Sequence, residues 1–335
     1  MTRRVAWAHR RAYLCRVIPV VHHPDYVAEA PARSPYQWNK NGLIRDLLMT
    51  EGERIAWHAP APMPLAWLEA VHDPAYVAEV LSAQVPRAKE RRIGFPVTPA
   101  VARRAAVVPG GTWLAARLAL AHGYAANSAG GSHHALADTG GGFCVFNDLA
   151  IAAHRLIADR DVERLMIVDA DVHQGDGTAA LLAGRPEIAT YSIHAERNFP
   201  VRKARSTLDV PLPDGVGDDD YCAALAATLT PLLDGFRPQL VLYQAGVDPY
   251  ADDRLGRLAL TRDGLVRRDR LVAALLTARG IPFASTVGGG YGSDAMEVAE
   301  RHVAAILTLG NATFGNIGSD PRQTSRADYL TTKMR

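Results

Sequence analysis

The chain has 335 residues, of which 48% are hydrophobic and 21% are charged, a balance typical of a globular protein. Its formal net charge of +2 and its scattered basic residues, with no aromatic and basic platform, give no support to a nucleic-acid-binding function. No stretch approaches the roughly 18 apolar residues needed to cross a bilayer, which argues against a membrane protein.

The N-terminal segment MTRRVAWAHRRAYLCRVIPVV is basic but lacks the continuous apolar core of a secretory signal. The three cysteines Cys15, Cys144 and Cys222 form no CxxC pair, which suits a reducing compartment and argues against a zinc site built from cysteines. Cys144 is expected to be a small buried packing residue. We therefore expect a cytoplasmic protein with no nucleic-acid or membrane partner.

In chain order, the first expected element is a strand at Tyr13–Val21, interrupted by Arg16. From about residue 100, short apolar runs alternate with longer helical patterns. The expected strands are Gly123–Ser128, Leu165–Asp169, Ile188–Ile193, Leu240–Gln244 and Ile281–Val287. The expected helices are Leu149–Ala158 after a cap at Asn147 or Asp148, Gly177–Ala183, Asp219–Leu233 ended or bent by Pro231, Leu265–Arg279, and Met296–Leu309 with Ser293 as N-cap.

Most of these strands lack polar alternation, so they are expected to be buried on both faces. We therefore predict an α/β fold with one central, mostly parallel sheet and helices on both faces. With no internal repeat or linker, residues 1–310 are expected to form a single domain, followed by a polar, poorly ordered tail at 311–335.

Ligands of such sheets bind beyond the carboxyl ends of the strands. Four expected strands run into polar or glycine-rich loops there: GGSHHA, DADVHQGDG, AGVDPYADDRLG and GGGYGSD. The active site is therefore predicted in the loops at this edge of the sheet.

Asp171 and His173 stand two residues apart on expected extended backbone, so their side chains project to the same side. With Asp248, which directly follows an apolar strand, they supply three donors of the kind that zinc prefers and leave a fourth position open, as in catalytic sites. The alternatives are a chance pairing of a surface aspartate with a core histidine, and an Asp248 that caps the turn before Pro249.

Two further acids, Asp169 and Asp176, flank this pair. Histidines that transfer protons usually need a carboxylate on the second ring nitrogen, and the tandem His133 and His134 would need two such partners. Tyr291 follows three glycines, and its phenol could donate to a developing oxyanion. The plainer alternatives are a helix N-cap at Asp176 and a packed tyrosine after a flexible turn.

Five ordered segments together resemble the zinc-dependent histone deacetylase superfamily, which has the arginase/deacetylase fold. They are GGSHHALADTGGGFCVFND, DADVHQGDG, QAGVDPYADDRLG, GGGY and HAERNFPVRKARSTLDVPLPDGVGDDDY, and the last looks most like the class IV branch and its bacterial relatives. The similarity runs from about Arg92 to Leu309. The segment SPYQWNKNGL departs from the usual family motif, and one glycine is replaced by Val287.

The resemblance implies one catalytic zinc ion held by Asp171, His173 and Asp248. It implies acid/base roles for His133 and His134, oriented by Asp169 and Asp176, and an oxyanion role for Tyr291. It further implies that Phe143, Phe199 and Gly142 line the acyl channel and that Asp253 is a buried supporting carboxylate. A structural potassium ion is implied near Asp169, Asp171, His173 and Ser192.

The implied activity is hydrolysis of acetyl or longer acyl groups from acylated lysine side chains of a peptide or protein. A small acylamine such as an acetylpolyamine is the alternative substrate. Two other classes stay open: an acyl-binding module without activity, and an arginase-like hydrolase with two metals.

Overall fold

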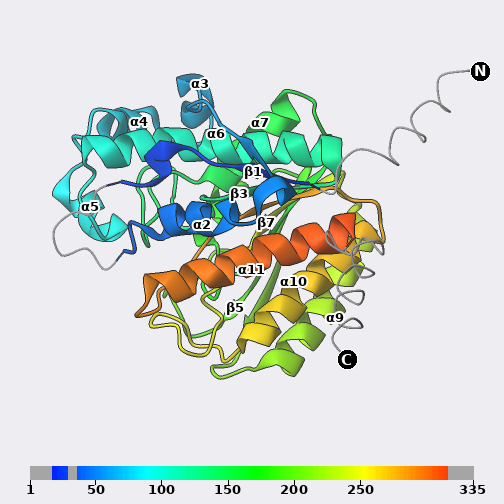
Figure 1. Cartoon of the computed structure of the whole chain (residues 1–335). Coiled ribbons are helices and arrows are strands. Elements are labelled where there is room, and N and C mark those ends of the chain that lie inside the picture. The colour runs from blue at the N-terminus through cyan, green and yellow to red at the C-terminus, as the bar shows by residue number, and fades with distance from the viewer. Residues whose placement is uncertain (1–16, 29–35, 316–335) are drawn as a thin grey trace, which may run out of the picture.

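The computed structural model describes residues 17–28 and 36–315 (Figure 1). All neighbouring strands of its 8-stranded sheet are parallel, in the order β2-β1-β3-β8-β7-β4-β5-β6. The strands are β1 Ile18–Val21, β2 Ile55–His58, β3 Tyr124–Asn127, β4 Leu165–Asp169, β5 Ile188–Ala195, β6 Leu208–Leu212, β7 Leu240–Gln244 and β8 Phe283–Thr286. The predicted α/β fold is therefore confirmed.

Helices cover both faces of the sheet (Figure 1). The α-helices are α2 Lys40–Met49, α3 Leu65–Glu69, α4 Pro74–Leu81, α5 Arg87–Ile93, α6 Pro99–His122, α7 Asp148–Ala158, α8 Asp176–Leu181, α9 Asp218–Phe236, α10 Arg262–Thr277 and α11 Ala295–Phe314; the 3-10 helices are η1 Pro24–Tyr26 and η2 Gly52–Arg54. Apolar residues of α2, α9, α10 and α11 pack on one face, and those of α6 and α7 pack on the other. None of the helices in the described residues is long and apolar enough to cross a membrane.

The strands at the centre of the sheet agree best with the sequence patterns. β4 and β7 have the predicted bounds, and every residue in them is buried. The two outer strands, β2 and β6, were not predicted, because they are only partly buried and their sequences IAWH and LDVPL give no long apolar run. Of the predicted first strand, Ile18–Val21 forms β1, while Tyr13–Arg16 lies outside the described residues.

The prediction that the helix containing Pro231 ends at Leu233 is wrong, because α9 continues to Phe236. Both Pro231 and Ala227, whose carbonyl would have accepted the missing hydrogen bond, are exposed. Water can therefore satisfy that carbonyl, and the helix tolerates the proline.

The predicted end of the last helix at Leu309 is also wrong. α11 runs to Phe314, so the first residues of the expected tail are helical, while 316–335 lie outside the described residues. Gly310 does not stop the helix: it packs so tightly on β1 that a Cβ there would lie 2.3 Å from Ile18 Cδ1. The N-cap is Asp294, which accepts from Met296 N, and not Ser293.

Three other helices are shifted by a few residues. α7 begins at Asp148, directly after the predicted N-cap Asn147. α8 spans Asp176–Leu181. α10 begins at Arg262, earlier than expected, and Thr261 is its N-cap. Asp176 is thus the first residue of α8 and not its N-cap, which is Gly175. Cys144 is buried, as expected for a packing residue.

His72 makes the fold sensitive to acid. The side chain is 2% exposed; Nδ1 lies 2.8 Å from the Leu136 carbonyl oxygen, and Nε2 accepts from Asn147 N at 3.0 Å. An imidazole that donates at one nitrogen and accepts at the other is neutral. Burial lowers the pKa of His72 to about 4, and protonation would break the contact to Asn147, the N-cap residue of α7.

We expect the free energy of unfolding to fall as the pH drops from about 6.5 to about 4, because in this window the unfolded chain binds the proton that folded His72 excludes. His72→Gln removes this titration and should flatten the slope by up to about 1.4 kcal/mol per pH unit. Urea unfolding of the wild-type protein and His72→Gln at several pH values measures this slope. The exposed His122→Gln is the matched control, and equal slopes in all three proteins would contradict the expectation.

Candidate functional site

The carboxyl ends of four adjacent strands, in the order β3, β8, β7 and β4, carry the predicted site residues. His133 and His134 follow β3, and Tyr291 follows β8. Asp248 follows β7, while Asp171 and His173 follow β4, whose last residue is Asp169. Because these strands are parallel neighbours, their loops meet at one edge of the sheet.

Asp171, His173 and Asp248 form a compact buried cluster, with one candidate ligand atom from each lying within 4.8 Å of the others. His173 Nδ1 lies 3.0 Å from Asp171 Oδ1 and 3.2 Å from Asp248 Oδ2. Asp248 Oδ2 is fully buried, and apart from this contact with His173 it has no hydrogen-bond donor among the described residues. An orphaned carboxylate oxygen beside an imidazole and a second carboxylate fits a divalent cation of the zinc type.

The charge at this cluster also favours a cation. Burial disfavours the charged form of His173, but the carboxylates of Asp171 and Asp248 outweigh it and raise its pKa to about 10. Burial and the Asp171 carboxylate raise the pKa of Asp248 to about 7. Both raised pKa values mean that bound protons offset the carboxylate charge of the cluster, and a bound metal ion would displace these protons.

Hydrogen bonds hold the ligand side chains in place. Asp171 Oδ2 accepts from Gln244 Nε2 and from Gly289 N, both at 2.8 Å. Asp248 Oδ1 accepts from Val172 N at 2.9 Å, which links the loop after β7 to the loop after β4. Such contacts to ligand carboxylates orient them for a metal.

Each of the tandem histidines has its own aspartate. His133 Nδ1 lies 2.6 Å from Asp169 Oδ2, and His134 Nδ1 lies 2.7 Å from Asp176 Oδ1. The two rings are 4.0 Å apart between centroids, and His133 Nε2 lies 3.8 Å from Asp171 Oδ1. Since each Nδ1 is engaged by a carboxylate, Nε2 is the nitrogen free to exchange a proton.

The two histidines differ in charge balance. Burial opposes protonation of both, but the carboxylates of Asp169 and Asp171 raise the pKa of His133 to about 9. For His134, burial and the neighbouring His133 lower the pKa to about 3 in spite of Asp176. The structure thus places two imidazoles of different basicity side by side.

Tyr291 is held by its backbone and ring. Its amide donates to Asp253 Oδ2 at 2.6 Å, and its ring lies 5.5 Å from that of Phe143. Burial and the nearby carboxylates Asp171 and Asp248 keep the pKa of its phenol well above the ordinary value. The hydroxyl has no hydrogen-bond partner in the part of the chain that the structure describes, so it is a protonated donor available to a ligand.

Gly142, Phe143 and Phe199 lie around the histidines. Gly142 has φ +52, and a Cβ there would lie 2.6 Å from His134 Cδ2 and 3.1 Å from Phe199 Cε1, so only glycine fits. The Phe199 ring is 4.8 Å from that of His134 and 44% exposed. Phe143 is fixed through its amide, which donates to Ile93 O at 2.8 Å.

Several supporting residues were missed by the sequence reasoning. Gln244, the last residue of an apolar strand, donates a hydrogen bond to Asp171, one of the three candidate metal ligands. The sequence signal for it is a polar residue at the end of that strand. Lys40 is only 2% exposed and donates to Gly288 O at 3.0 Å, while Gln37 Nε2 donates to Gly292 O at 2.6 Å. These two hydrogen bonds hold the loop on both sides of Tyr291, and no local sequence pattern predicts them.

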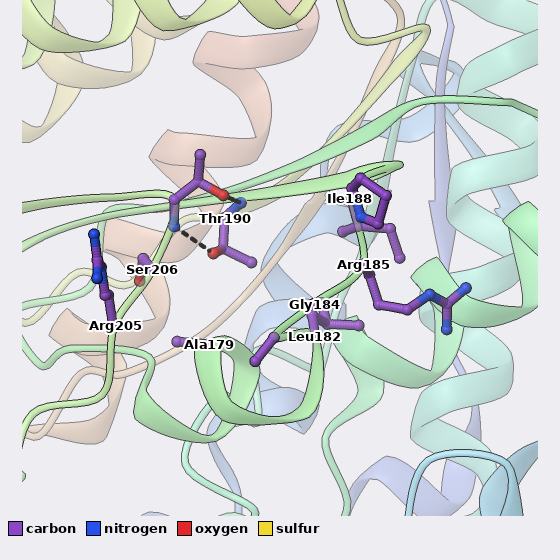
Figure 2. Close-up of a pocket in the computed structure, with 11 residues that line it drawn as sticks. Ala179, Leu182, Gly184, Arg185, Ile188, Thr190, Arg205 and Ser206 are labelled. Atoms are coloured by element: carbon purple, nitrogen blue, oxygen red, sulfur yellow. Dashed lines mark hydrogen bonds between the residues drawn. The ribbon is translucent and has the colours of Figure 1, made fainter.

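Ser192, predicted near a potassium ion, is buried within β5, in register with Asp169 of β4, and its Oγ lies 3.0 Å from His194 Nδ1. A cavity of about 630 Å³ lies elsewhere, beside α8 and β5, where Thr190 and Thr207 exchange hydrogen bonds (Figure 2). No predicted site residue lines it; its lining is Ala179, Leu182, Ala183, Gly184, Arg185, Pro186, Ile188, Thr190, Arg205, Ser206 and Thr207.

Comparison with known proteins gives a consistent picture. Residues 27–307 match the model of the histone deacetylase domain. An uncharacterized protein of Picosynechococcus sp. is 45% identical over 288 residues, which cover 85% of this chain and 95% of that protein. Histone deacetylase 2 of Arabidopsis thaliana is 36% identical over 185 residues, 54% of this chain and 48% of that protein.

Among solved structures, an acetylpolyamine aminohydrolase from Burkholderia pseudomallei is similar, with a TM-score of 0.74 over 88% of this chain and 99% of that one. At 21% sequence identity, this likeness supports the fold alone.

Proposed function

The chain belongs to the histone deacetylase domain family, and from that premise we propose that it is a zinc-dependent amidohydrolase that removes acetyl or longer acyl groups from acylated lysine side chains. The observation that carries the proposal is the meeting of three elements in one buried place. These are the ligand cluster of Asp171, His173 and Asp248, two histidine–aspartate pairs and a free phenol.

The ligand residues fit a zinc ion, which when bound supplies a Lewis acid for the acyl carbonyl and lowers the pKa of water. Gln244 and the Gly289 amide keep Asp171 directed at that position. His133 and His134 hold or move protons at their Nε2 atoms, one accepting from the attacking water and one donating to the leaving amine. The Tyr291 hydroxyl donates to the oxygen of the tetrahedral intermediate. The products are a carboxylate and a free amine.

Gly142, Phe143 and Phe199 provide the walls of the acyl channel in this proposal. An apolar slot lined by two aromatic rings suits the methylene chain of an acylated lysine, which buries apolar surface without needing hydrogen bonds. The proposed potassium ion would be structural, held near Asp169, Asp171, His173 and Ser192 largely by backbone oxygens.

A small acylamine such as an acetylpolyamine is the second candidate substrate, because the similar solved structure is named an acetylpolyamine aminohydrolase. Both substrates present an amide at the end of a methylene chain, so the same cluster could serve either. An acyl-binding module without activity is disfavoured, because the tandem histidines, the phenol and all three ligand side chains are present.

The test is hydrolysis of a panel of acyl-lysine peptides and acylpolyamines of increasing acyl length by the zinc-loaded full chain. We expect release of the free amine from acyl-lysine peptides, with higher kcat/KM than from acylpolyamines, and loss of release when zinc is removed by a chelator. Preference for the polyamines would support the second candidate. Tight binding of the peptides without release would support the binding module.

A further inference from the structure

A fully buried arginine lies directly behind the two loops that carry the ligand cluster. Arg268, in α10, is 0% exposed. Its Nη1 donates to Gly246 O at 2.6 Å and to Ala170 O at 3.2 Å. Ala170 immediately precedes Asp171, and Gly246 lies two residues before Asp248. One nitrogen of the guanidinium therefore joins the loop after β4 to the loop after β7.

A neighbouring carboxylate orients the guanidinium. Arg268 Nε donates to Asp269 Oδ1 at 2.9 Å, and the same oxygen accepts from the Tyr243 hydroxyl at 2.7 Å. Because the guanidinium is a rigid planar fork, fixing its Nε edge also fixes the direction of Nη1. The Asp269 contact thus aims Nη1 at the two loop carbonyls.

Stability alone does not account for this arrangement. Replacing a buried ion pair by well-packed apolar residues is often neutral or stabilising, because two charges must be removed from water. The polar groups here are also incompletely paired. Asp269 Oδ2 makes no hydrogen bond among the described residues, and Arg268 Nη2 has only its ion-pair contact of 2.9 Å with the already shared Asp269 Oδ1. What an apolar pair could not supply is the bond from Nη1 to each loop.

We propose that Arg268 is a positioning residue, which keeps Asp171 and Asp248 at the separation that a bound metal ion requires. The inference rests on the proposed function, since it presumes that the cluster binds a metal. α10 packs between α9 and α11 on one face of the sheet (Figure 1). This packing holds the backbone that carries the guanidinium in a fixed position. Outer-shell partners of this kind typically contribute 10-fold to 100-fold to metal affinity.

The sign of the effect separates positioning from simple electrostatics. A fixed positive charge behind the cluster repels a cation, so removing the charge alone should tighten metal binding. Loss of the carbonyl contacts should instead let the two loops move and weaken it. The two roles therefore predict opposite changes in affinity.

The test is zinc affinity of the full chain, measured by competition with a chromogenic chelator, for Arg268→Met and Arg268→Lys. We expect Arg268→Met to bind zinc about 10-fold to 100-fold more weakly. Arg268→Lys keeps the charge and can restore only part of the fork, so its affinity should fall in between. Unchanged or tighter binding by Arg268→Met would overturn the proposal.

The control for loss of stability is Leu276→Ala, which removes a fully buried apolar side chain from the same helix. It should lower the thermal unfolding temperature of the metal-free protein and leave zinc affinity unchanged. If it weakens zinc as much as Arg268→Met does, positioning is refuted. Should Arg268→Met fail to fold, Arg268→Lys decides by the same criterion. A wild-type chain that binds no zinc would instead refute the proposed function itself.

Discussion

Replacing Asp171 by alanine is expected to remove both the bound metal ion and the hydrolytic activity. Its Oδ1 lies 3.0 Å from His173 Nδ1, and its Oδ2 accepts from Gln244 and from the Gly289 amide. The substitution thus deletes one of three ligands and leaves three buried donors, Gln244 Nε2, Gly289 N and His173 N, without their acceptor. Metal catalysis contributes several kcal/mol to the transition state, so we expect turnover to fall about 1000-fold or more.

Metal analysis of the purified chains and initial rates on an acetyl-lysine peptide measure the effect. The wild-type protein should hold about one tightly bound divalent ion per chain, and Asp171→Ala should hold none. Two ions per wild-type chain would favour the arginase-like alternative. Turnover unchanged in Asp171→Ala would refute the mechanism.

Asp218→Asn is the matched control for this substitution. Asp218 also supports a loop, because it accepts a hydrogen bond from Thr261 N at 2.8 Å. It is only half-buried and lies in α9, an element that carries none of the three ligand residues. It should keep both metal content and turnover. A parallel loss in the control would show that the effect is a general one on folding.

The sequence predicts the part of the site that depends on strand ends. β4 and β7 are continuous apolar runs, so their bounds and the positions of Asp171, His173 and Asp248 follow from hydrophobicity alone. The alternation of side chains along extended backbone then puts Asp169 and Asp171 on one side. The pairing of each tandem histidine with an aspartate was suggested by chemistry and by the family resemblance.

The parts that the sequence does not predict depend on contacts between distant segments. Lys40 bonds to Gly288 across 248 residues, and Gln37 bonds to Gly292 across 255. Arg268 reaches the loop at Ala170 across 98 residues, from an ordinary amphipathic helix pattern. Composition and periodicity describe local structure, whereas these bonds arise only when the sheet order brings the segments together.

The predicted ends of two helices, α9 and α11, are wrong for a related reason. Glycine and proline are local signals for helix termination, yet Gly310 lies inside α11 because β1 packs against it, and Pro231 lies inside α9 because water can reach the Ala227 carbonyl. Tertiary packing and solvent exposure, which a local pattern does not contain, decided both cases.

Replacing Tyr291 by phenylalanine is expected to lower turnover and to spare substrate binding. The loop is held by groups that the substitution leaves intact: the amide bonded to Asp253, the Gly288 carbonyl bonded to Lys40, and the ring beside Phe143. Only the hydroxyl is lost, and it has no partner among the described residues. A single oxyanion donor contributes about 100-fold to 1000-fold to kcat, so kcat should fall by that amount with KM little changed.

Steady-state kinetics and metal analysis of Tyr291→Phe measure this, with Tyr124→Phe as the control. Tyr124 is a fully buried tyrosine whose hydroxyl bonds to Ser285 at 2.8 Å, between β3 and β8. Its substitution should cost about 1 kcal/mol of stability and leave kcat unchanged. Because the Tyr291 hydroxyl is proposed to act only on the oxyanion, metal content should stay at the wild-type level. Full turnover in Tyr291→Phe would remove the phenol from the mechanism, and lost metal would assign it to the ligand cluster instead.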